Sequence, residues 1–484
     1  MDTAQFAPQL RAILGQRAVI SEREQLRTYE CDGLTGYRVV PALVVLPETA
    51  GHVQAVVRLC NEHNIPFVAR GSGTGLSGGA LPVKQGVLIV LTRMRRILEV
   101  DLPNQRVVVE PGVINLWITQ AVAADRYYYA PDPSSQLVCS IGGNVAENSG
   151  GAHCLKYGFT TNHVTGLEVV LPDGEIVRLG GKAPDAPGYD LIGTIVGSEG
   201  TLGIVTKITV KVLRKPETVQ TLLAAYPTTD EAGATVSGII AAGIVPAAAE
   251  MMDALAIEAA EAAVHAGYPS DAGALLIVEL DGPAAEVAHQ FERVQAICRQ
   301  NGATQIRIAA DDEERVLMWK GRKSAFAAVG RISPDYYVQD GVIPRTALPA
   351  VLRAIAALGV ERGVRVANVF HAGDGNLHPL VLYDGAEEGA AGRAEQAAGD
   401  ILDICLKHGG SITGEHGVGE DKKKYMQRMF SEDDLRTMQL LRCAFDPAGL
   451  CNPGKIFPTP RLCGEVPGHH HTHAVEAAGL ADRF

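Results

Sequence analysis

Two histidines flank a tight turn in the segment VANVFHAGDGNLHP, residues 366–379. Asp374 followed by Gly375 between two apolar runs is typical of a two-residue β-hairpin turn. With that turn, His371 would face His378 across the ladder, where directly opposed side chains have Cβ atoms about 4.5–5.5 Å apart. Two imidazoles at that spacing can share one divalent ion, with Zn, Mn and Fe as candidates. The alternative is an ordinary hairpin whose histidines meet backbone partners.

A third ligand for such an ion is present in ITGEHGVG, residues 412–419. Glycines on both sides of Glu415 and His416 let the backbone come close to a buried site. A carboxylate with two histidines leaves coordination positions open for substrate, which is the catalytic rather than the structural arrangement. His416 would then be free to act as a base near neutral pH.

Glycine is heavily used, at 53 of 484 residues, and it is concentrated in the segment RGSGTGLSGGA, residues 70–80. Such a run can turn successive backbone N–H groups inward and hold a pyrophosphate without side-chain charge. The GxGxxG pattern at Gly73, Gly75 and Gly78 is not a Rossmann fingerprint, because Pro82 and a strand follow it instead of a helix. A surface loop without a ligand is the alternative.

Three further stretches are similarly rich in glycine or small polar residues: PDPSS at 131–135, SIGGNVAENSGG at 140–151 and GSEGTLGIV at 197–205. Any one of them alone would be an ordinary turn. Four such stretches in the first half of one chain favour a long ligand with several parts. Flavin adenine dinucleotide (FAD) fits that demand.

The surrounding pattern predicts a mixed α+β protein, because strands and helices do not alternate regularly. In the first half it predicts a helix at 52–64 and strands at 65–70, 87–91, 107–110, 167–171, 176–179 and 204–212. A boundary is expected near 213–219. Beyond it the pattern predicts strands at 222–226, 275–280, 305–308 and 336–343, with helices at 283–301, 311–329 and up to Gly363.

Composition excludes several classes of protein. The formal charge of −12 argues against nucleic acid as a partner. The nine cysteines contain no CxxC pair, which argues against an iron–sulfur cluster bound by this chain. No apolar stretch is long enough for a membrane span, so a cytoplasmic protein attached to a membrane only through partners is expected. The HHHTH run at 469–473 belongs to a tail expected to be flexible, with metal affinity as the alternative.

The glycine stretches together with WKGRKSAF, DYYVQDGVIP, HAGDGNLHP, GEHGVG and NPGKIF resemble the FAD flavoproteins of p-cresol methylhydroxylase type. Within them they resemble the dehydrogenases of glycolate, D-lactate and D-2-hydroxyglutarate. The resemblance covers nearly the whole chain. It implies an N-terminal segment at 1–37, an FAD-binding domain at 38–216, a substrate cap with an antiparallel sheet and the metal site at 217–425, a returning segment at 426–462 and the tail at 463–484.

The resemblance also implies roles for individual residues. His371, His378 and Glu415 match the family's metal ligands, His416 its base and Arg322 the arginine that binds the substrate carboxylate. The cofactor would be lined by Arg70, Gly71, Ser72, Gly73, Thr74, Gly75, Gly78, Gly79, Pro131, Asp132, Ser134, Ser140, Gly142, Gly143, Asn144, Asn148, Gly150, Glu199, Gly200, Ile204, Asn452 and Lys455.

Two departures from relatives refine this expectation. Residues 69–81 contain no histidine, so the FAD is expected to be bound without a covalent link. Val338 and Gln339 occupy positions where relatives that act on longer diacids carry a basic residue, which suits a small monoacid.

The expected activity is oxidation of a small 2-hydroxy acid, most simply glycolate to glyoxylate, by hydride transfer to FAD. The likeness further implies a complex with a second FAD-type subunit and an iron–sulfur subunit. The alternatives are a D-lactate dehydrogenase of the same family, a metal-dependent hydrolase that uses the histidines with water, and a flavin-binding subunit without catalysis.

Overall fold

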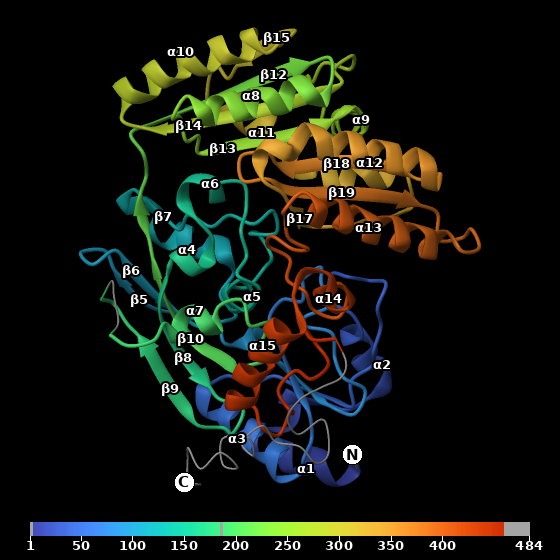
Figure 1. The fold of residues 1–484 in the computed structure, drawn as a ribbon. Coiled ribbons are helices and arrows are strands. Elements are labelled where there is room, and N and C mark those ends of the chain that lie inside the picture. Colours follow the sequence, from blue (N-terminus) through green and yellow to red (C-terminus); the bar gives the residue numbers. More distant parts are fainter. Residues whose placement is uncertain (1–2, 184–186, 459–484) are drawn as a thin grey trace.

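The computed structural model describes residues 3–183 and 187–458, which form two lobes and a returning C-terminal segment (Figure 1). The sheets of the N-terminal lobe lie within residues 19–214, and the sheet of the cap lobe lies within residues 218–383. The last strand of the N-terminal lobe ends at Arg214 and the first strand of the cap begins at Thr218, inside the boundary expected from the sequence. The HHHTH run and the rest of 463–484 lie outside the described residues.

The N-terminal lobe contains three small sheets. The first has the order β1 (Val19–Ile20), β2 (Leu43–Val45), β4 (Val87–Val90) and β3 (Phe67–Arg70), with β2, β4 and β3 parallel. The second is antiparallel, in the order β5 (Ile97–Asp101), β6 (Arg106–Val109), β10 (Ile204–Lys211), β8 (Val164–Val170) and β9 (Ile176–Gly180). The third pairs β11 (Leu213–Arg214) with β7 (Tyr127–Tyr128).

The N-terminal lobe also contains the helices α1 (Thr3–Leu14), α2 (Arg23–Leu26), α3 (Ala50–Glu62), α4 (Asn115–Val122), α5 (Ile141–Glu147), α6 (Cys154–Tyr157) and α7 (Leu191–Ile195). The predicted helix at 52–64 is confirmed as α3. Its N-cap Thr49 accepts a hydrogen bond from His52 N–H, and its apolar face, including Val53 and Cys60, is fully buried.

The cap lobe is built on one antiparallel sheet. Its order is β15 (Gln305–Ile308), β12 (Thr218–Tyr226), β14 (Ala274–Gly282), β13 (Ala248–Asp253), β18 (Arg365–His371), β19 (Asn376–Tyr383) and β16 (Asp335–Val338), with β17 (Gly341–Val342) also on β19. Alternate residues of each strand point to opposite faces. Leu222, Leu276 and Phe370 therefore belong to one apolar core, and Leu223, Leu275 and Val369 belong to the other.

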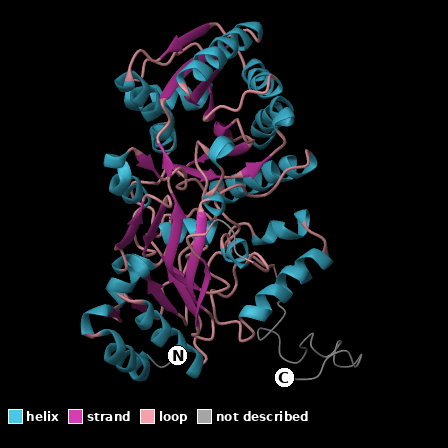
Figure 2. Ribbon diagram, turned by 90° about the vertical axis from the view of Figure 1, so that its left-hand side faces the viewer, coloured by secondary structure: helices cyan, strands magenta, loops and turns pink. Residues whose placement is uncertain are grey.

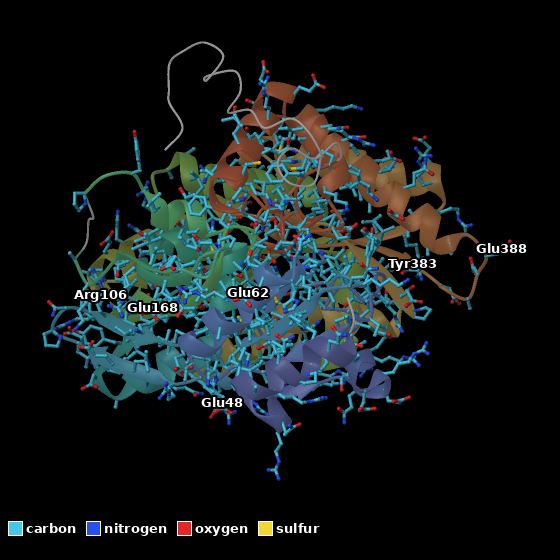
Figure 3. All side chains as sticks on the ribbon, turned by 90° about the horizontal axis from the view of Figure 1, so that it is seen from below. Glu48, Glu62, Arg106, Glu168, Tyr383 and Glu388 are labelled. Atoms are coloured by element: carbon cyan, nitrogen blue, oxygen red, sulfur yellow. The ribbon has the colours of Figure 1, made fainter. Side chains whose placement is uncertain are left out.

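Helices cover both faces of this sheet (Figure 2). One face packs against α8 (Thr229–Ala241), α10 (Ala284–Gln300), α12 (Leu348–Arg362) and α13 (Ala390–Lys407), and the other against α9 (Ala254–Val264) and α11 (Asp312–Ala328). Seen from below, Tyr383 at the end of β19 and Glu388 in the loop before α13 lie toward the outer edge of the cap, away from Arg106 and Glu168 of the N-terminal lobe (Figure 3).

The register expected for the histidine hairpin is wrong by two residues. His371 lies opposite Asn376 and His378 opposite Val369, so residues 372–375 form a four-residue connection in place of the two-residue turn. Because side chains alternate with a period of two, this shift leaves both histidines on the same face of the sheet. Their ring centroids are 5.1 Å apart.

The single strand expected at 336–343 is also wrong, because it is interrupted between β16 and β17. Gln339 N–H still donates to Pro379 O of β19 at 3.1 Å, but the regular strand stops before it, and both Gln339 and Asp340 are fully buried. The carboxylate of Asp340 accepts hydrogen bonds from the 413–416 segment instead. A buried carboxylate must be paired, and the break in the strand makes that pairing possible.

The C-terminal segment returns to the N-terminal lobe. Glu420 N–H donates to Ser77 O at 3.0 Å, and Asn452 N–H donates to Phe67 O at 2.8 Å. Between these contacts lie α14 (Met426–Met429) and α15 (Glu432–Phe445), which lie beside the N-terminal lobe in Figure 1. Ser431 caps α15 in a reciprocal capping box with Asp434. None of the helices in the described part of the chain is both long and apolar enough to cross a membrane.

Candidate active site

One large cavity of about 870 Å³ lies between the two lobes. This volume is at the upper end of the range for cofactor sites, about 300–1,000 Å³. Its walls include the glycine stretches of the N-terminal lobe. They also include six residues from the second half of the chain: Arg322, Phe326, His371, His378, Glu415 and His416. The glycine stretches and the histidine hairpin therefore line the same cavity, although they lie far apart in the sequence.

The glycine wall is made by close backbone approach. A Cβ on Gly71 would collide with Ser140 Oγ, which accepts a hydrogen bond from Ser72 N–H at 3.2 Å. Gly73 has φ +72°, a conformation that L side chains rarely adopt. Arg70 Nη1 donates to Cys31 O at 2.6 Å and ties this loop to the N-terminal segment.

Most of the predicted cofactor residues line the cavity: Arg70, Gly71, Ser72, Gly73, Thr74, Gly75, Gly79, Ser134, Ser140, Gly142, Gly143, Asn144, Glu199, Gly200 and Ile204. The others do not line the cavity: Gly78, Pro131, Asp132, Asn148, Gly150, Asn452 and Lys455.

Three of these residues, Asp132, Asn452 and Lys455, form ion pairs or hydrogen bonds with other parts of the protein. Asp132 Oδ2 pairs with His153 Nδ1 at 3.0 Å, and His153 Nε2 in turn lies 3.2 Å from Glu279 Oε1 of β14. Asp132 thus belongs to a contact between the N-terminal lobe and the cap. Asn452 Nδ2 donates to Gly79 O at 2.9 Å, and Lys455 Nζ donates to Leu81 O at 3.0 Å. These two residues support the first glycine loop from behind.

The predicted metal ligands converge on one point. His371 Nε2 lies 3.2 Å and His378 Nε2 lies 3.1 Å from the same oxygen, Oε1 of Glu415. One ligand atom from each of the three residues falls within 4.8 Å of the others. The opposite ring nitrogen of His371, Nδ1, is 2.7 Å from Glu250 Oε1, so a neutral ring that donates from Nδ1 would leave Nε2 to bind a cation. This donor set fits a divalent cation of the zinc type.

A second group with suitable spacing comprises Asp340, His378 and His416. Asp340 Oδ2 already accepts hydrogen bonds from Thr413 Oγ1 at 2.6 Å and from three successive N–H groups of residues 414–416 at 3.0, 3.2 and 2.9 Å. Burial alone would raise the pKa of Asp340, but His416 and Lys422 hold that pKa below its usual range. Asp340 is therefore an anchor for the 413–416 backbone, and the His371 group is the better cation site.

His416 lies flat against His378, with ring centroids 5.0 Å apart and planes inclined by 14°. Burial lowers the pKa of His416 to about 4, although Asp340 acts to raise it. The ring is therefore neutral at pH 7 and has a nitrogen lone pair available to accept a proton.

Arg322, on α11, is only 2% exposed and pairs with Glu250 through Nη2 and Oε2 at 2.6 Å. Neither Nε nor Nη2 has a hydrogen-bond partner among the described residues, so the contact with Glu250 is an ion pair without hydrogen-bond geometry. A buried guanidinium with an unpaired N–H at a cavity wall is suited to bind an anion. The helix that carries it begins at the N-cap Asp311, whose side chain accepts from Glu314 N–H at 2.9 Å.

Two further carboxyls, Glu147 and Glu199, lie against the 417–419 backbone at the cavity. Glu199 accepts hydrogen bonds from Val418 and Gly419 N–H, each at 2.7 Å, and a Cβ on Gly417 would collide with Glu147 Oε2. Burial and the neighbouring Glu199 raise the pKa of Glu147 well above its usual range. Burial also raises the pKa of Glu199 to about 7, against those two hydrogen bonds. Burial therefore favours the protonated form of both carboxyls.

Sequence reasoning missed Glu250, Asp340 and Glu147. Glu250 stands in the apolar strand AAEMMD, where an isolated acid was a usable sign of a buried partner. Asp340 was read as part of a continuous strand. Glu147 lies inside the glycine stretch at 140–151, where the small residues are the signal of a ligand-binding loop.

Two family models match the chain. The model of the FAD binding domain matches residues 41–180, and that of the C-terminal domain of FAD linked oxidases matches residues 215–456. The chain belongs to the FAD-linked oxidases. FAD is therefore the cofactor of the chain, and this FAD-linked oxidase is a flavin-dependent oxidoreductase.

Curated relatives of this FAD-linked oxidase span nearly its whole length. The glycolate oxidase subunit GlcD of Escherichia coli K12 is 52% identical over 94% of this chain and 91% of its own, and GlcD of Bacillus subtilis is 42% identical over 89% and 92%. A D-lactate dehydrogenase of Anaerostipes hadrus is 33% identical over 86% and 89%.

The expected fold class is confirmed by solved structures. p-Cresol methylhydroxylase with substrate bound matches with a TM-score of 0.80 at 19% identity, over 94% of this chain and 96% of its own. A 4-ethylphenol oxidase from Gulosibacter chungangensis matches with a TM-score of 0.77 at 18% identity, over 94% and 97%.

Proposed function

We propose that this FAD-linked oxidase oxidises glycolate to glyoxylate at the cavity between its lobes. One observation carries the proposal: the glycine wall and the residues Arg322, His371, Glu415 and His416 line the same cavity. A cofactor and a small hydroxy acid bound there would be in contact. The names of the GlcD relatives support glycolate as the substrate.

The first glycine loop, the Ser140–Asn144 segment and the 199–204 segment would hold FAD. The absence of histidine from residues 69–81 supports binding without a covalent link through that loop. Bound FAD supplies the acceptor for the hydride that leaves the substrate Cα. His371, His378 and Glu415 would hold a divalent cation, and Zn, Mn and Fe all remain candidates. A cation held there supplies Lewis acidity toward the substrate hydroxyl.

Substrate binding and proton transfer would be carried out by residues of the chain. The guanidinium of Arg322 binds the substrate carboxylate through its free N–H groups. A neutral His416 accepts the hydroxyl proton as the Cα–H bond breaks, so the alcohol loses one proton and one hydride and becomes a carbonyl. Help from a general base of this kind is worth about 10²–10⁴-fold in rate.

Replacement of His416 tests this assignment. Purified His416→Ala should keep its FAD and should reduce it with glycolate about 10²–10⁴ times more slowly than the wild type. Wild-type reduction rates in this variant would exclude His416 as the base.

D-lactate is the alternative substrate, supported by the D-lactate dehydrogenase relative. Val338 lines the cavity and offers no charge to a second carboxylate, which supports a small monoacid over D-2-hydroxyglutarate. Anaerobic titration with the three acids, with metal analysis on the same sample, tests the proposal. The yellow FAD should bleach most efficiently with glycolate, and a protein that bleaches with none of the three acids would refute the oxidase proposal.

The electrons must then leave the protein. Because the GlcD relatives are named as subunits, we propose that this chain works in a complex, with a second FAD-type subunit and an iron–sulfur subunit as acceptors. Any attachment to a membrane would come through those partners in the cytoplasm. Purification of the tagged chain under mild conditions, followed by iron analysis of the co-purified proteins, tests this arrangement.

A further inference from the structure

Glu250 forms two contacts that join separate parts of the site. Its Oε1 lies 2.7 Å from His371 Nδ1, and its Oε2 lies 2.6 Å from Arg322 Nη2. All three residues are buried, with exposed fractions of 1%, 5% and 2% for Glu250, His371 and Arg322. Removal of the carboxylate would therefore leave the guanidinium buried without its counter-charge.

The sheet register places Glu250 at this position. In the antiparallel pairing of β13 with β18, Glu250 lies directly opposite His371. Directly opposed side chains on one face are held about 4.5–5.5 Å apart at Cβ, within reach of a hydrogen bond. Arg322 reaches the same carboxylate from α11, which packs on that face of the sheet. The contact is thus set by two rigid elements.

Each contact has a chemical consequence. The hydrogen bond from His371 Nδ1–H keeps the Nε2 lone pair directed at Glu415, where a cation would bind. The ion pair between Nη2 and Oε2 holds the guanidinium beside Glu250, and neither Nη2 nor Nε has a hydrogen-bond partner among the described residues. A shift of about 1 Å at either group can cost about 10²-fold in rate.

We propose that Glu250 is a positioning residue that holds the substrate-binding Arg322 and the cation-binding His371 as one unit. This inference rests on the proposed function of the cavity. Loss of the Glu250 carboxylate is expected to weaken cation binding and glycolate binding together. Electrostatics alone predicts the opposite for the substrate, because removal of a negative charge would favour an anionic acid.

The test compares the wild type with Glu250→Gln, Glu250→Asp and the control Asp253→Asn, all loaded with FAD. Glutamine has one acceptor oxygen, so it can satisfy His371 or Arg322 but not both. Asp253 is a carboxylate on the same strand that accepts from Ala256 N–H at 2.9 Å and Asn368 N–H at 2.8 Å. It does not line the cavity.

Two quantities are measured: Zn²⁺ affinity in competition with a chelator, and the glycolate concentration that half-saturates anaerobic FAD reduction. In Glu250→Gln the Zn²⁺ affinity should fall about 10–100-fold, and the half-saturating glycolate concentration should rise about 10-fold or more. Asp253→Asn should leave both unchanged.

The inference is overturned if either quantity stays at its wild-type value in Glu250→Gln, or if the half-saturating concentration falls. If Glu250→Gln does not fold, Glu250→Asp decides by the same two measurements, because it keeps the charge and shortens the reach by one methylene. Failure of the proposed function is distinguished by the wild type itself, which would then show no reduction of FAD by glycolate.

Discussion

Replacement of Asp340 by asparagine should affect stability and catalysis together. The Oδ2 atom of Asp340 accepts five hydrogen bonds: from Thr413 Oγ1, from the N–H groups of residues 414–416 and from Lys422 Nζ. Asp340 and Lys422 are 0% and 1% exposed. Removal of one partner from a buried ion pair costs about 3–5 kcal/mol, because the other charge remains buried. We expect the free energy of unfolding to fall by that amount.

The effect on catalysis follows from the same hydrogen bonds. Asp340 fixes the backbone of Glu415 and His416, so Asp340→Asn should displace both residues. The rate of FAD reduction by glycolate should fall roughly 100-fold, as expected for a misplacement of about 1 Å. Guanidinium unfolding and anaerobic stopped-flow reduction at pH 7 measure the two effects on one sample.

Lys422→Met provides the matched control. If the buried pair carries the effect, the double variant Asp340→Asn with Lys422→Met should lose less stability than the sum of the single variants, by about 1–3 kcal/mol. The reasoning is refuted if Asp340→Asn unfolds at the wild-type denaturant concentration and reduces its FAD at the wild-type rate.

Three other replacements have separable expected outcomes. Arg322→Lys should keep its FAD but require about 10-fold more glycolate for half-saturation, because a point charge replaces the planar guanidinium; an unchanged value in steady-state kinetics would exclude Arg322 as the carboxylate ligand. Gly71→Ala should lose FAD on gel filtration, because its Cβ would collide with Ser140 Oγ at the cofactor wall, and full retention of absorbance at 450 nm would contradict this. Burial lowers the pKa of His163 from 6.5 to about 4, so between these values the unfolded chain binds a proton that the folded protein does not, and stability should fall by up to about 3 kcal/mol as the pH drops from 6.5 to 4. His163→Gln should flatten that slope in pH-dependent unfolding, and an unchanged slope would show that His163 does not cause it.

The resemblance allowed many parts of the site to be predicted because its motifs are local. The glycine loops and the HAGDGNLHP and GEHGVG segments each contain their functional residues within about a dozen positions. Their composition predicts backbone-lined anion sites and a hairpin turn without knowledge of the fold. The predicted cofactor residues that line the cavity come largely from these stretches.

The histidine pair shows how far a local argument extends. Both histidines lie on one face, as expected, because a strand alternates with period two. The exact partner across the ladder was wrong, since residues 372–375 form a longer connection than Asp374 and Gly375 alone would give. Turn length is decided by the hydrogen bonds of the whole sheet.

Composition and local pattern by themselves determined the two-part α+β organisation, the glycine-walled anion site and the residue types available for cation binding and proton transfer. Only the tertiary structure decided which buried carboxylates pair with the site histidines and with the backbone that carries them. Glu250 meets His371 through the pairing of β13 with β18, and Asp340 meets the 413–416 backbone through a break in a strand. Such buried pairs join residues more than 70 positions apart, and their partners become neighbours only when the sheet register and the packing of the lobes are formed.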